Sequence, residues 1–444
     1  MSVFTYIQRQ PRFVIIACLF ILALVGIRIA ILPFSPPGFY IDEAATGAHV
    51  VSMLEQGTNA HGQSWPLFSS SLGGGYTTPI YLYPLTAWST IFGAHEVSLR
   101  YFSEFITLLA IGFLSLATSY WLGKRMALVT AIVGLSLPWS WLQGSLAWDP
   151  AMVPLLIAIS FFAFSSLLFS DSKRLKVTST MLLPVTLIAL AYVYPPARVT
   201  APLLYLIFYV TLYLRKALSL KMVLVSAAAA FLLVLPLAIF MIQPEALGRT
   251  STLSVFSHVS LIEGIGKLGL NILLLLNPVF LFLVGDLNLR HSTLFQGMLG
   301  YGALIPIAVL IIYAIKHRRV QFSPRNNTTH LLILIICLGI LCSILGSALT
   351  GEGQPHSLRA TAAWPFMALL VSLGWYVIFE ARQRVLLYTA LTLFVISTAA
   401  YAVDLAFYYP ARAAESFDVS TRKNLVSGEQ TDYPPMVLDY YKNK

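Results

Sequence analysis

Apolar stretches of about twenty residues recur along the whole chain, and they constrain its fold more than any other feature of the sequence. A helix needs about 20 residues to cross the ~30 Å hydrocarbon core of a bilayer. Stretches of this kind lie at 13–33, 101–122, 126–144, 151–170, 177–194, 199–214, 222–242, 297–315, 330–349, 361–379 and 385–405. Because 58% of the 444 residues are hydrophobic and only 10% are charged, polar side chains cannot cover a water-soluble globule of this size. The sequence therefore predicts an all-α integral membrane protein with about 11 transmembrane helices.

Short clusters of Lys and Arg between these stretches predict the orientation of the chain. With the amino terminus in the cytoplasm, sixteen of the 28 Lys and Arg residues fall in cytoplasmic loops, as the positive-inside rule requires. The net charge of +10 is then a consequence of topology and not of a nucleic-acid-binding face. We predict a multi-pass protein of the plasma (inner) membrane that binds no nucleic acid.

This orientation places two long loops on the extracytoplasmic side, 34–98 and 243–296. Each contains an apolar stretch that proline interrupts, at 76–92 and at 268–284. We interpret both stretches as interfacial or re-entrant helices, because irregular backbone is tolerated at membrane depth only where protein or a cavity covers it. The predicted domains are a polytopic domain over 1–405 and a short extracytoplasmic tail over 406–444.

The first outer loop is acidic, and its carboxylates begin in the sequence "YIDEAA". Asp42 and Glu43 follow the first predicted membrane exit, and no Lys or Arg occurs anywhere in 34–98. One interpretation is that the pair caps the amino end of a short helix. One carboxylate suffices for that, whereas a second adds repulsion unless something uses it. We therefore predict a catalytic role, in which a general base takes a proton from an acceptor hydroxyl or amine.

Cationic side chains occur near predicted helix ends on the same outer face. Arg198 follows "YVYPP", and His356 and Arg359 lie in "PHSLRA". A phosphate leaving group near a membrane needs positive charge and hydrogen-bond donors to stabilise the charge on its oxygens. We predict that these three residues bind such a phosphate. The alternative for each arginine is a side chain that snorkels to lipid headgroups or water, and the turn "GDLNLRH" at 285–291 poses the same choice.

The sequence contains no compact metal-binding motif. The spacing of His49, His61 and His95 does not match a known ligand pattern, so a His/carboxylate cluster would have to be assembled in three dimensions. All three cysteines lie in apolar stretches, which argues against disulfides and thiolate metal sites. We therefore assign no metal ligand and no cofactor, and a divalent metal ion, for which Asp42 is a suitable hard ligand, stays an open alternative.

Several short pieces follow one another in a characteristic order. They are "DEAATGA", "GQSWPLFSS", "TPIYLYP", "FGAHEVSLRYFSEF", "AYVYPPARVTAP", "NPVFLFLVGDLNLRH" and "PHSLRATAAWP". As an ordered set over roughly residues 1–380, they resemble the GT-C glycosyltransferases. The resemblance is to the bacterial relatives of protein O-mannosyltransferases and of the transferases that add aminoarabinose to lipid A.

The resemblance implies a GT-C type fold with interfacial helices in a large first outer loop. It also implies an inverting transferase that takes a sugar from a polyprenyl-phosphate-linked donor and moves it to a lipid, glycan or protein acceptor on the extracytoplasmic or periplasmic side. Protein-mannosylating members of this superfamily work without a metal ion, whereas the oligosaccharyltransferase branch needs one. We expect no large soluble domain after the last helix, of the kind that many members carry, so the resemblance does not imply which acceptor is used.

The resemblance further implies roles for individual residues. Asp42 would be the base or would orient the acceptor, and Glu43 would support it. The candidates for binding the donor phosphate are Arg198, His356, Arg359, Arg100, Arg290 and His291. The candidates for binding the acceptor are Asp149, Trp148 and Tyr81, of which the two aromatic rings are suited to stacking on sugars or to anchoring at the membrane interface.

Three other functions fit parts of the pattern. A transporter or flippase of lipid-linked sugars would use similar arginines, but it would place coupling charges near the bilayer midplane and show paired repeats, which we do not find. A polymerase or ligase of diphosphate-linked glycans would be expected to concentrate its arginines in one late outer loop. A membrane scaffold would need none of these charged groups.

Overall fold

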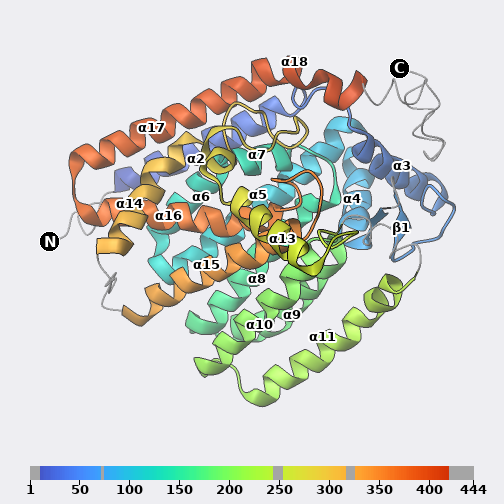
Figure 1. Ribbon diagram of the computed structural model, residues 1–444, viewed down its shortest axis with the longest axis horizontal. Helices are drawn as coiled ribbons and strands as arrows, with labels where there is room; N and C mark the ends of the chain where they lie inside the picture. The colour runs from blue at the N-terminus through green and yellow to red at the C-terminus, as the bar shows by residue number, and fades with distance from the viewer. Residues whose placement is uncertain (1–10, 72–74, 244–253, 317–325, 420–444) are drawn as a thin grey trace.

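The computed structural model describes the backbone of residues 11–71, 75–243, 254–316 and 326–419. Helices dominate this part of the chain, and they pack into one bundle (Figure 1). The strands that it contains form a two-stranded antiparallel hairpin of β1 (Ser69–Ser70) and β2 (Tyr76–Thr77). The predicted tail beyond residue 419 and positions 244–253 of the predicted second outer loop lie outside the described residues.

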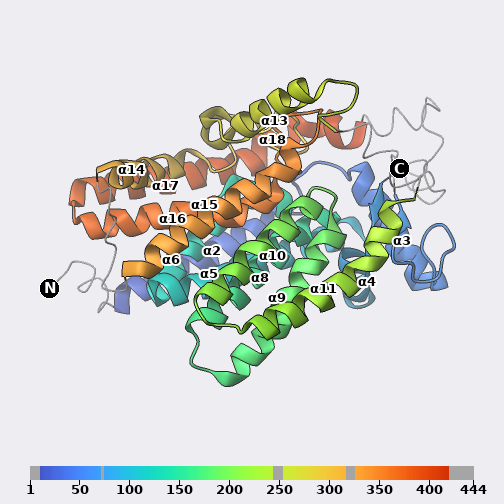
Figure 2. The same ribbon diagram turned by 60° about the horizontal axis from the view of Figure 1, so that its bottom comes forward.

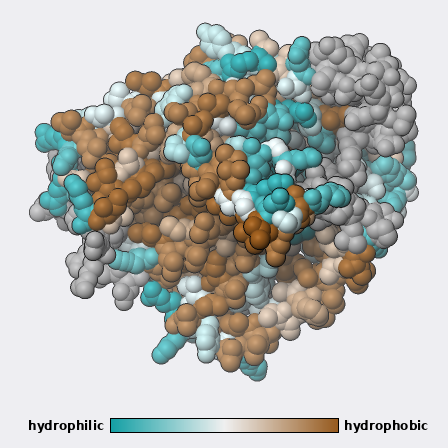
Figure 3. Space-filling view, viewed as in Figure 1, coloured by the Kyte–Doolittle hydropathy of each residue, from teal (hydrophilic) through white to brown (hydrophobic). Residues whose placement is uncertain are grey.

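Within the described residues, ten helical segments are long and apolar enough to cross a membrane. They are α2 (Pro11–Ile31), α5 (Glu96–Leu122), η2 with α8 (Asp149–Phe169), α9 (Lys173–Val193), α10 (Ala197–Leu214), α11 (Leu220–Met241), α13 with η3 (Leu261–Leu283), Thr329–Ala348 within α15 (Asn326–Ala348), η5 with α16 (Thr361–Ala381), and Arg384–Phe417, which begins with α17 (Arg384–Val403). Apolar side chains accordingly cover much of the face in Figure 3. The chain is a multi-pass membrane protein.

Two predicted spans are less regular than the sequence suggests. The stretch at 126–144 is a pair of helices, α6 (Lys124–Ser136) and α7 (Pro138–Gly144), bent by 63°. Leu137 between them is extended, with φ −66° and ψ 126°, because a residue before proline avoids the helical region. The stretch at 297–315 gives only a shorter helix, Tyr301–Lys316, which comprises η4 and α14 (Leu304–Lys316).

The two proline-containing stretches differ in the structure: the first forms one short helix that continues through Pro84, and the second is interrupted after Leu275. In the first outer loop, α3 (Ile41–Gln56) is followed by α4 (Pro79–Phe92), whose 14 residues extend about 21 Å and are too short to span. In the later stretch, α13 ends at Leu275, and a π-helical turn, η3 (Val279–Leu283), follows Pro278. Together α13 and η3 have the length and composition of a span, so this stretch is longer than the interfacial helix expected at 268–284.

The centre of the bundle is formed by α5, α6, α8, α9 and α16, with α8 and α16 the most deeply enclosed (Figure 2). A buried ion pair holds part of this centre together. Arg28 of α2 donates to both carboxylate oxygens of Glu104 of α5, at 2.5 and 2.9 Å. The same guanidinium donates to the carbonyls of Leu135 and Ser140. Both charges are therefore paired, as a low-dielectric interior requires.

Gly144 leaves room for this ion pair, so Gly144→Ala should destabilise the bundle. A Cβ at this position would lie 2.6 Å from Glu104 Oε2 and 3.1 Å from Arg28 Nη2. Breaking a buried pair costs about 3–5 kcal/mol, and we expect a destabilisation that approaches this range. The measurement is thermal unfolding of the purified protein in detergent.

The matched control is Gly26→Ala, close to the same arginine in sequence but with nothing within 4 Å of the position that its new methyl group would take. Replacing glycine by alanine inside a helix is normally neutral or favourable. Equal melting temperatures for the two variants would show that the ion pair tolerates the added methyl group.

Candidate active site

Four segments that are distant in sequence meet beside the start of α3. They are the turn before α3, the turn between α7 and η2 (Asp149–Ala151), the loop 284–300 and the loop 349–360. Arg290 donates a hydrogen bond to the Tyr40 hydroxyl, and its guanidinium carbon lies 4.8 Å from the centre of that ring. The ring of Trp148 lies 6.1 Å from Tyr40 and 6.0 Å from His291. The fold thus brings the acidic first loop to the cationic later loops.

Asp42 occupies the first turn of α3 and is partly exposed. The amino end of a helix favours a negative charge, so its carboxylate is stabilised there. Burial raises the pKa of Tyr40 well above its usual range, and the charge and hydrogen bond of Asp42 raise it further. Asp149 lies close enough to Asp42 for their charges to interact. Asp42 is therefore an accessible carboxylate in contact with a phenol.

Glu43, the next residue, has the opposite environment. It is completely buried, and its carboxylate accepts four hydrogen bonds. Oε1 accepts from Arg100 Nε at 2.9 Å and from the Ala147 amide at 2.8 Å. Oε2 accepts from Arg100 Nη2 at 2.7 Å and from the Tyr40 amide at 3.0 Å. Glu43 thereby fastens the start of α3 to α5 and to the turn after α7.

The guanidinium of Arg100 is likewise fully engaged in hydrogen bonds. Besides Glu43, its guanidinium donates to the carbonyls of Pro36 at 2.8 Å and Gly38 at 2.7 Å. These bonds hold the chain that leads from α2 into α3, and the side chain is buried. Because its donors already have partners, Arg100 is a positioning residue that lies behind the site.

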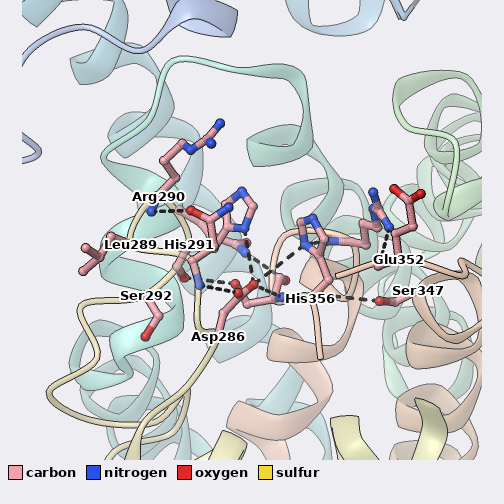
Figure 4. A network of polar contacts seen from close by, with 12 residues as sticks. Asp286, Leu289, Arg290, His291, Ser292, Ser347, Glu352 and His356 are labelled. Atoms are coloured by element: carbon pink, nitrogen blue, oxygen red, sulfur yellow. Dashed lines mark hydrogen bonds and ion pairs between the residues drawn. The ribbon is translucent and has the colours of Figure 1, made fainter. Parts of the chain in front are cut away.

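A second group of polar side chains lies around Asp286 in the loop after η3 (Figure 4). The Asp286 carboxylate lies 3.3 Å from His291 Nδ1 and 3.8 Å from His356 Nδ1, and the two imidazole rings stack at 4.5 Å. Burial lowers the pKa of His356, and the neighbouring charges of His291, Arg359 and Arg290 lower it further. Although burial opposes it, the adjacent imidazoles hold the pKa of Asp286 below its usual value. This group combines one carboxylate with four cationic or imidazole side chains.

The backbone around Asp286 is fixed by a chain of hydrogen bonds. The Ser357 amide donates to Asp286 Oδ2 at 2.8 Å, and the Ser357 hydroxyl donates to the carbonyl of His291 at 2.9 Å. The Ser357 carbonyl accepts from Trp139 Nε1 and Gln143 Nε2 of α7 at 3.1 and 3.0 Å. The bent helix α7 thus positions both loops, which pre-organises their side chains.

Comparison with solved structures identifies the architecture. One crystal structure, that of ArnT from Cupriavidus metallidurans bound to undecaprenyl phosphate, matches with a TM-score of 0.55 at 12% identity, covering 97% of this chain and 74% of that one. Another, the Archaeoglobus fulgidus oligosaccharyltransferase tethered to an acceptor peptide, matches with a TM-score of 0.52 at 13% identity, covering 98% of this chain and 59% of that one. The chain has the GT-C fold. No family model and no curated protein sequence matches it.

On this GT-C fold, Arg198 lies in the first turn of α10, and its guanidinium contacts Met241 Sδ at 2.8 Å. Its Nε is buried without a hydrogen-bond partner among the described residues, as is that of Arg290. Arg359 lies beside the cluster, where its charge acts on His356 and its guanidinium donates to the Thr350 hydroxyl and the Glu352 carbonyl, both at 2.9 Å.

The residues predicted to bind an acceptor have different degrees of access. Asp149 is partly exposed beside Asp42. Trp148 is 4% exposed, and its indole N–H is buried without a hydrogen-bond partner among the described residues. Tyr81 is completely buried, with its hydroxyl 2.8 Å from Ser103 Oγ. Asp149 and Trp148 therefore border the site, whereas Tyr81 packs behind it.

Two residues of the site are absent from the sequence-based assignment. Tyr40 links Asp42 to Arg290, and Asp286 gathers the two histidines. The signal for Asp286 is its position in "GDLNLRH", where Gly285 has φ +86° and opens a tight turn. Tyr40 carries no comparable signal, because its role depends on an arginine 250 residues away.

If Glu43 is structural, Glu43→Gln should destabilise the protein. The substitution leaves Arg100 buried with no opposite charge, which costs about 3–5 kcal/mol in comparable cases. Thermal unfolding in detergent measures the effect. Glu55→Gln, on the exposed end of the same helix, is the control and should leave the melting temperature unchanged. A Glu43→Gln protein with full stability but no function would instead place Glu43 in the chemistry.

Proposed function

We propose that this protein is an inverting glycosyltransferase that moves a sugar from a polyprenyl-phosphate-linked donor to an acceptor on the extracytoplasmic face. The GT-C fold supports this, since the similar ArnT structure is bound to undecaprenyl phosphate. The observation that carries the proposal is the pairing across Tyr40 of an accessible carboxylate, Asp42, with a guanidinium, Arg290. The transfer needs a base that takes the proton of the acceptor and a cation that stabilises the leaving phosphate, and these two groups lie on either side of Tyr40.

Arg290 is suited to the phosphate for a specific reason. Its Nη1 donates to Tyr40, but its Nε is buried and has no hydrogen-bond partner among the described residues. A buried donor without a partner costs about 1–3 kcal/mol, and a phosphate oxygen would remove that cost. On the side of the cluster around Asp286, Arg359 adds positive charge, and His291 and His356 add ring nitrogens.

The proposed transfer is a single displacement. Asp42 accepts the proton of the acceptor hydroxyl or amine while the acceptor atom forms a bond to the anomeric carbon. The bond from that carbon to the phosphate oxygen breaks, and its electron pair stays on the polyprenyl phosphate, where Arg290 stabilises it. In-line attack inverts the anomeric centre. Asp149, beside Asp42, lies where it can orient the acceptor.

The sidedness of the proposal comes from the basic clusters, which place the start of α3 outside when the amino terminus is inside. The donor enters from the lipid, and the acceptor enters from the aqueous phase or the membrane surface. Holding both at one edge of the bundle converts a bimolecular encounter into a reaction between neighbours. The transfer of a lipid-linked sugar to a lipid, glycan or protein is the reaction class that fits.

Asp42→Asn should abolish transfer while leaving the protein folded, because the side chains have nearly the same size and only the charge is lost. The measurement is mass spectrometry of surface glycans, glycolipids and glycoproteins from cells with the wild type, the variant or no protein, at matched membrane abundance. We expect a mass increment of one sugar with the wild type only. Glu55→Gln is the control and should keep the increment.

The contrary outcomes separate the alternatives. An increment that persists in Asp42→Asn removes Asp42 as the base. If deletion leaves surface glycans unchanged while carrier-linked sugar accumulates on the cytoplasmic face, the protein is a transporter of lipid-linked sugars.

Arg290→Gln should impair use of the donor. Removing one group that stabilises developing charge typically lowers the rate by about 10²–10³-fold, so kcat/KM for the polyprenyl-linked donor should fall by that amount. A transfer assay with purified protein in detergent and varied donor measures it. Lys267→Gln, an exposed cation of α13, is the control. Unchanged donor kinetics in Arg290→Gln would limit Arg290 to holding Tyr40.

A further inference from the structure

The carboxylate of Asp286 and the imidazoles of His291 and His356 converge on one point, as Figure 4 shows. Each offers one ligand atom, and these three atoms all lie within 4.8 Å of one another. We propose that Asp286, His291 and His356 bind a single divalent transition-metal ion, with Zn²⁺ as the preferred ion. The proposal concerns these residues alone and stands independently of the transferase reaction.

The distances suit such an ion. Zn²⁺ binds imidazole nitrogen and carboxylate oxygen at about 2.0–2.2 Å in tetrahedral geometry, which places neighbouring ligand atoms about 3.4 Å apart. Asp286 Oδ2 lies 3.3 Å from His291 Nδ1 and 3.8 Å from His356 Nδ1. The ligand atoms of the two imidazoles lie within 4.8 Å of each other, so they would have to approach by up to about 1.4 Å to reach the tetrahedral separation. Two imidazoles and one carboxylate are also a ligand set that Zn²⁺ accepts and that Mg²⁺ or Ca²⁺, which prefer oxygen, do not favour.

The nitrogens are available for coordination. His291 is 9% exposed, yet its Nδ1 has no hydrogen-bond partner among the described residues, despite its short distance to the Asp286 carboxylate. His356 Nδ1 is an acceptor, since the backbone N–H of Arg359 lies 3.4 Å from it, and a nitrogen that accepts has a free lone pair. That contact is at the long limit of a hydrogen bond, so a metal bond would replace a weak interaction.

The carboxylate is held in place from behind. Asp286 Oδ1 accepts from the Asn288 amide at 2.9 Å, and Oδ2 accepts from the Ser357 amide at 2.8 Å. Ser357 also fixes the backbone of His291 through its hydroxyl. Outer contacts of this kind orient metal ligands and raise affinity.

Three protein ligands leave one position open on a tetrahedral ion, the arrangement of sites that bind a water or a substrate. A divalent ion with one carboxylate ligand keeps a net positive charge, and Arg290 and Arg359 are close enough to add to the positive potential at this cluster. A negatively charged fourth ligand is therefore favoured. We assign that position to a phosphate oxygen. This part of the inference rests on the proposed function, because the donor would supply the phosphate.

The test uses full-length protein purified in detergent with an affinity tag that contains no histidine. After incubation with ZnCl₂ and dialysis, elemental analysis should find about one zinc per chain, the stoichiometry of one three-ligand site. Replacement by CoCl₂ should give the visible absorption of a tetrahedral cobalt site. Asp286→Asn, His291→Gln and His356→Gln should each abolish stoichiometric binding.

His61→Ala is the matched control, since this exposed histidine lies near another histidine, His49, with ring centres 5.5 Å apart. It should bind zinc as the wild type does. A wild-type protein that holds no zinc, or zinc that is lost with His61→Ala and kept in the other variants, would overturn the site. If a variant fails to fold, the wild type alone decides, because ZnCl₂ should raise its melting temperature by ligand linkage and no rise would contradict the proposal.

The fourth ligand is tested separately on the cobalt-loaded protein. Undecaprenyl phosphate and inorganic phosphate are added in separate arms, and either should shift the cobalt spectrum if phosphate occupies the open position. A shift with the lipid alone identifies the carrier, and a shift with both identifies the phosphate group as sufficient. An unchanged spectrum in both arms overturns the fourth-ligand assignment and leaves the zinc stoichiometry to decide the metal site.

Discussion

The buried ion pair between Glu43 and Arg100 determines where the acidic first loop can lie. A carboxylate with four hydrogen bonds and a guanidinium with two further carbonyls leave little freedom for the start of α3. Asp42 follows from this constraint, because the turn that buries Glu43 must direct its neighbour toward Tyr40 and Asp149. The two adjacent acids therefore have different roles: Glu43 holds the start of α3 in place, and Asp42 lies among the polar groups of the site.

A second constraint comes from the bend between α6 and α7. Pro138 turns the chain, and Trp139 and Gln143 of α7 then bind the Ser357 carbonyl. Through Ser357 and Asp286 the loops 284–300 and 349–360 are tied to each other. A span that crossed the membrane as one straight helix would not present these donors there. The irregularity of α6 and α7 is therefore part of the site, as broken backbone near membrane depth usually is.

The sequence predicts the helices well and the site in part. Length and hydropathy suffice for most of the spans, and Pro278 suffices for the break after α13, because both are local effects. They do not predict the bend between α6 and α7, the short helix Tyr301–Lys316 or the span-length segment Leu261–Leu283. Placing Asp42 and His356 on one face follows from loop order. The burial of Glu43 does not, since its partner Arg100 is 57 residues away, and "DE" contains nothing to distinguish the two acids. The cluster around Asp286 could not be predicted from the sequence for the same reason, because His291 and His356 come together only when the chain folds.

Tyr40 joins the two halves of the site in a way that bears on the order of events. Its hydroxyl accepts from Arg290 and its neighbour is Asp42, so the positive and negative groups are coupled through one phenol. A phosphate that engages the unpartnered Nε of Arg290 does so without displacing Tyr40. A phosphate that takes Nη1 as well displaces Tyr40 from Arg290, while the hydrogen bond between Tyr40 and Asp42 is already present and stays in place. Monodentate binding through Nε is therefore the mode that keeps Tyr40 bonded to both charged groups, so that the proposed base and the phosphate-binding cation stay joined through one side chain.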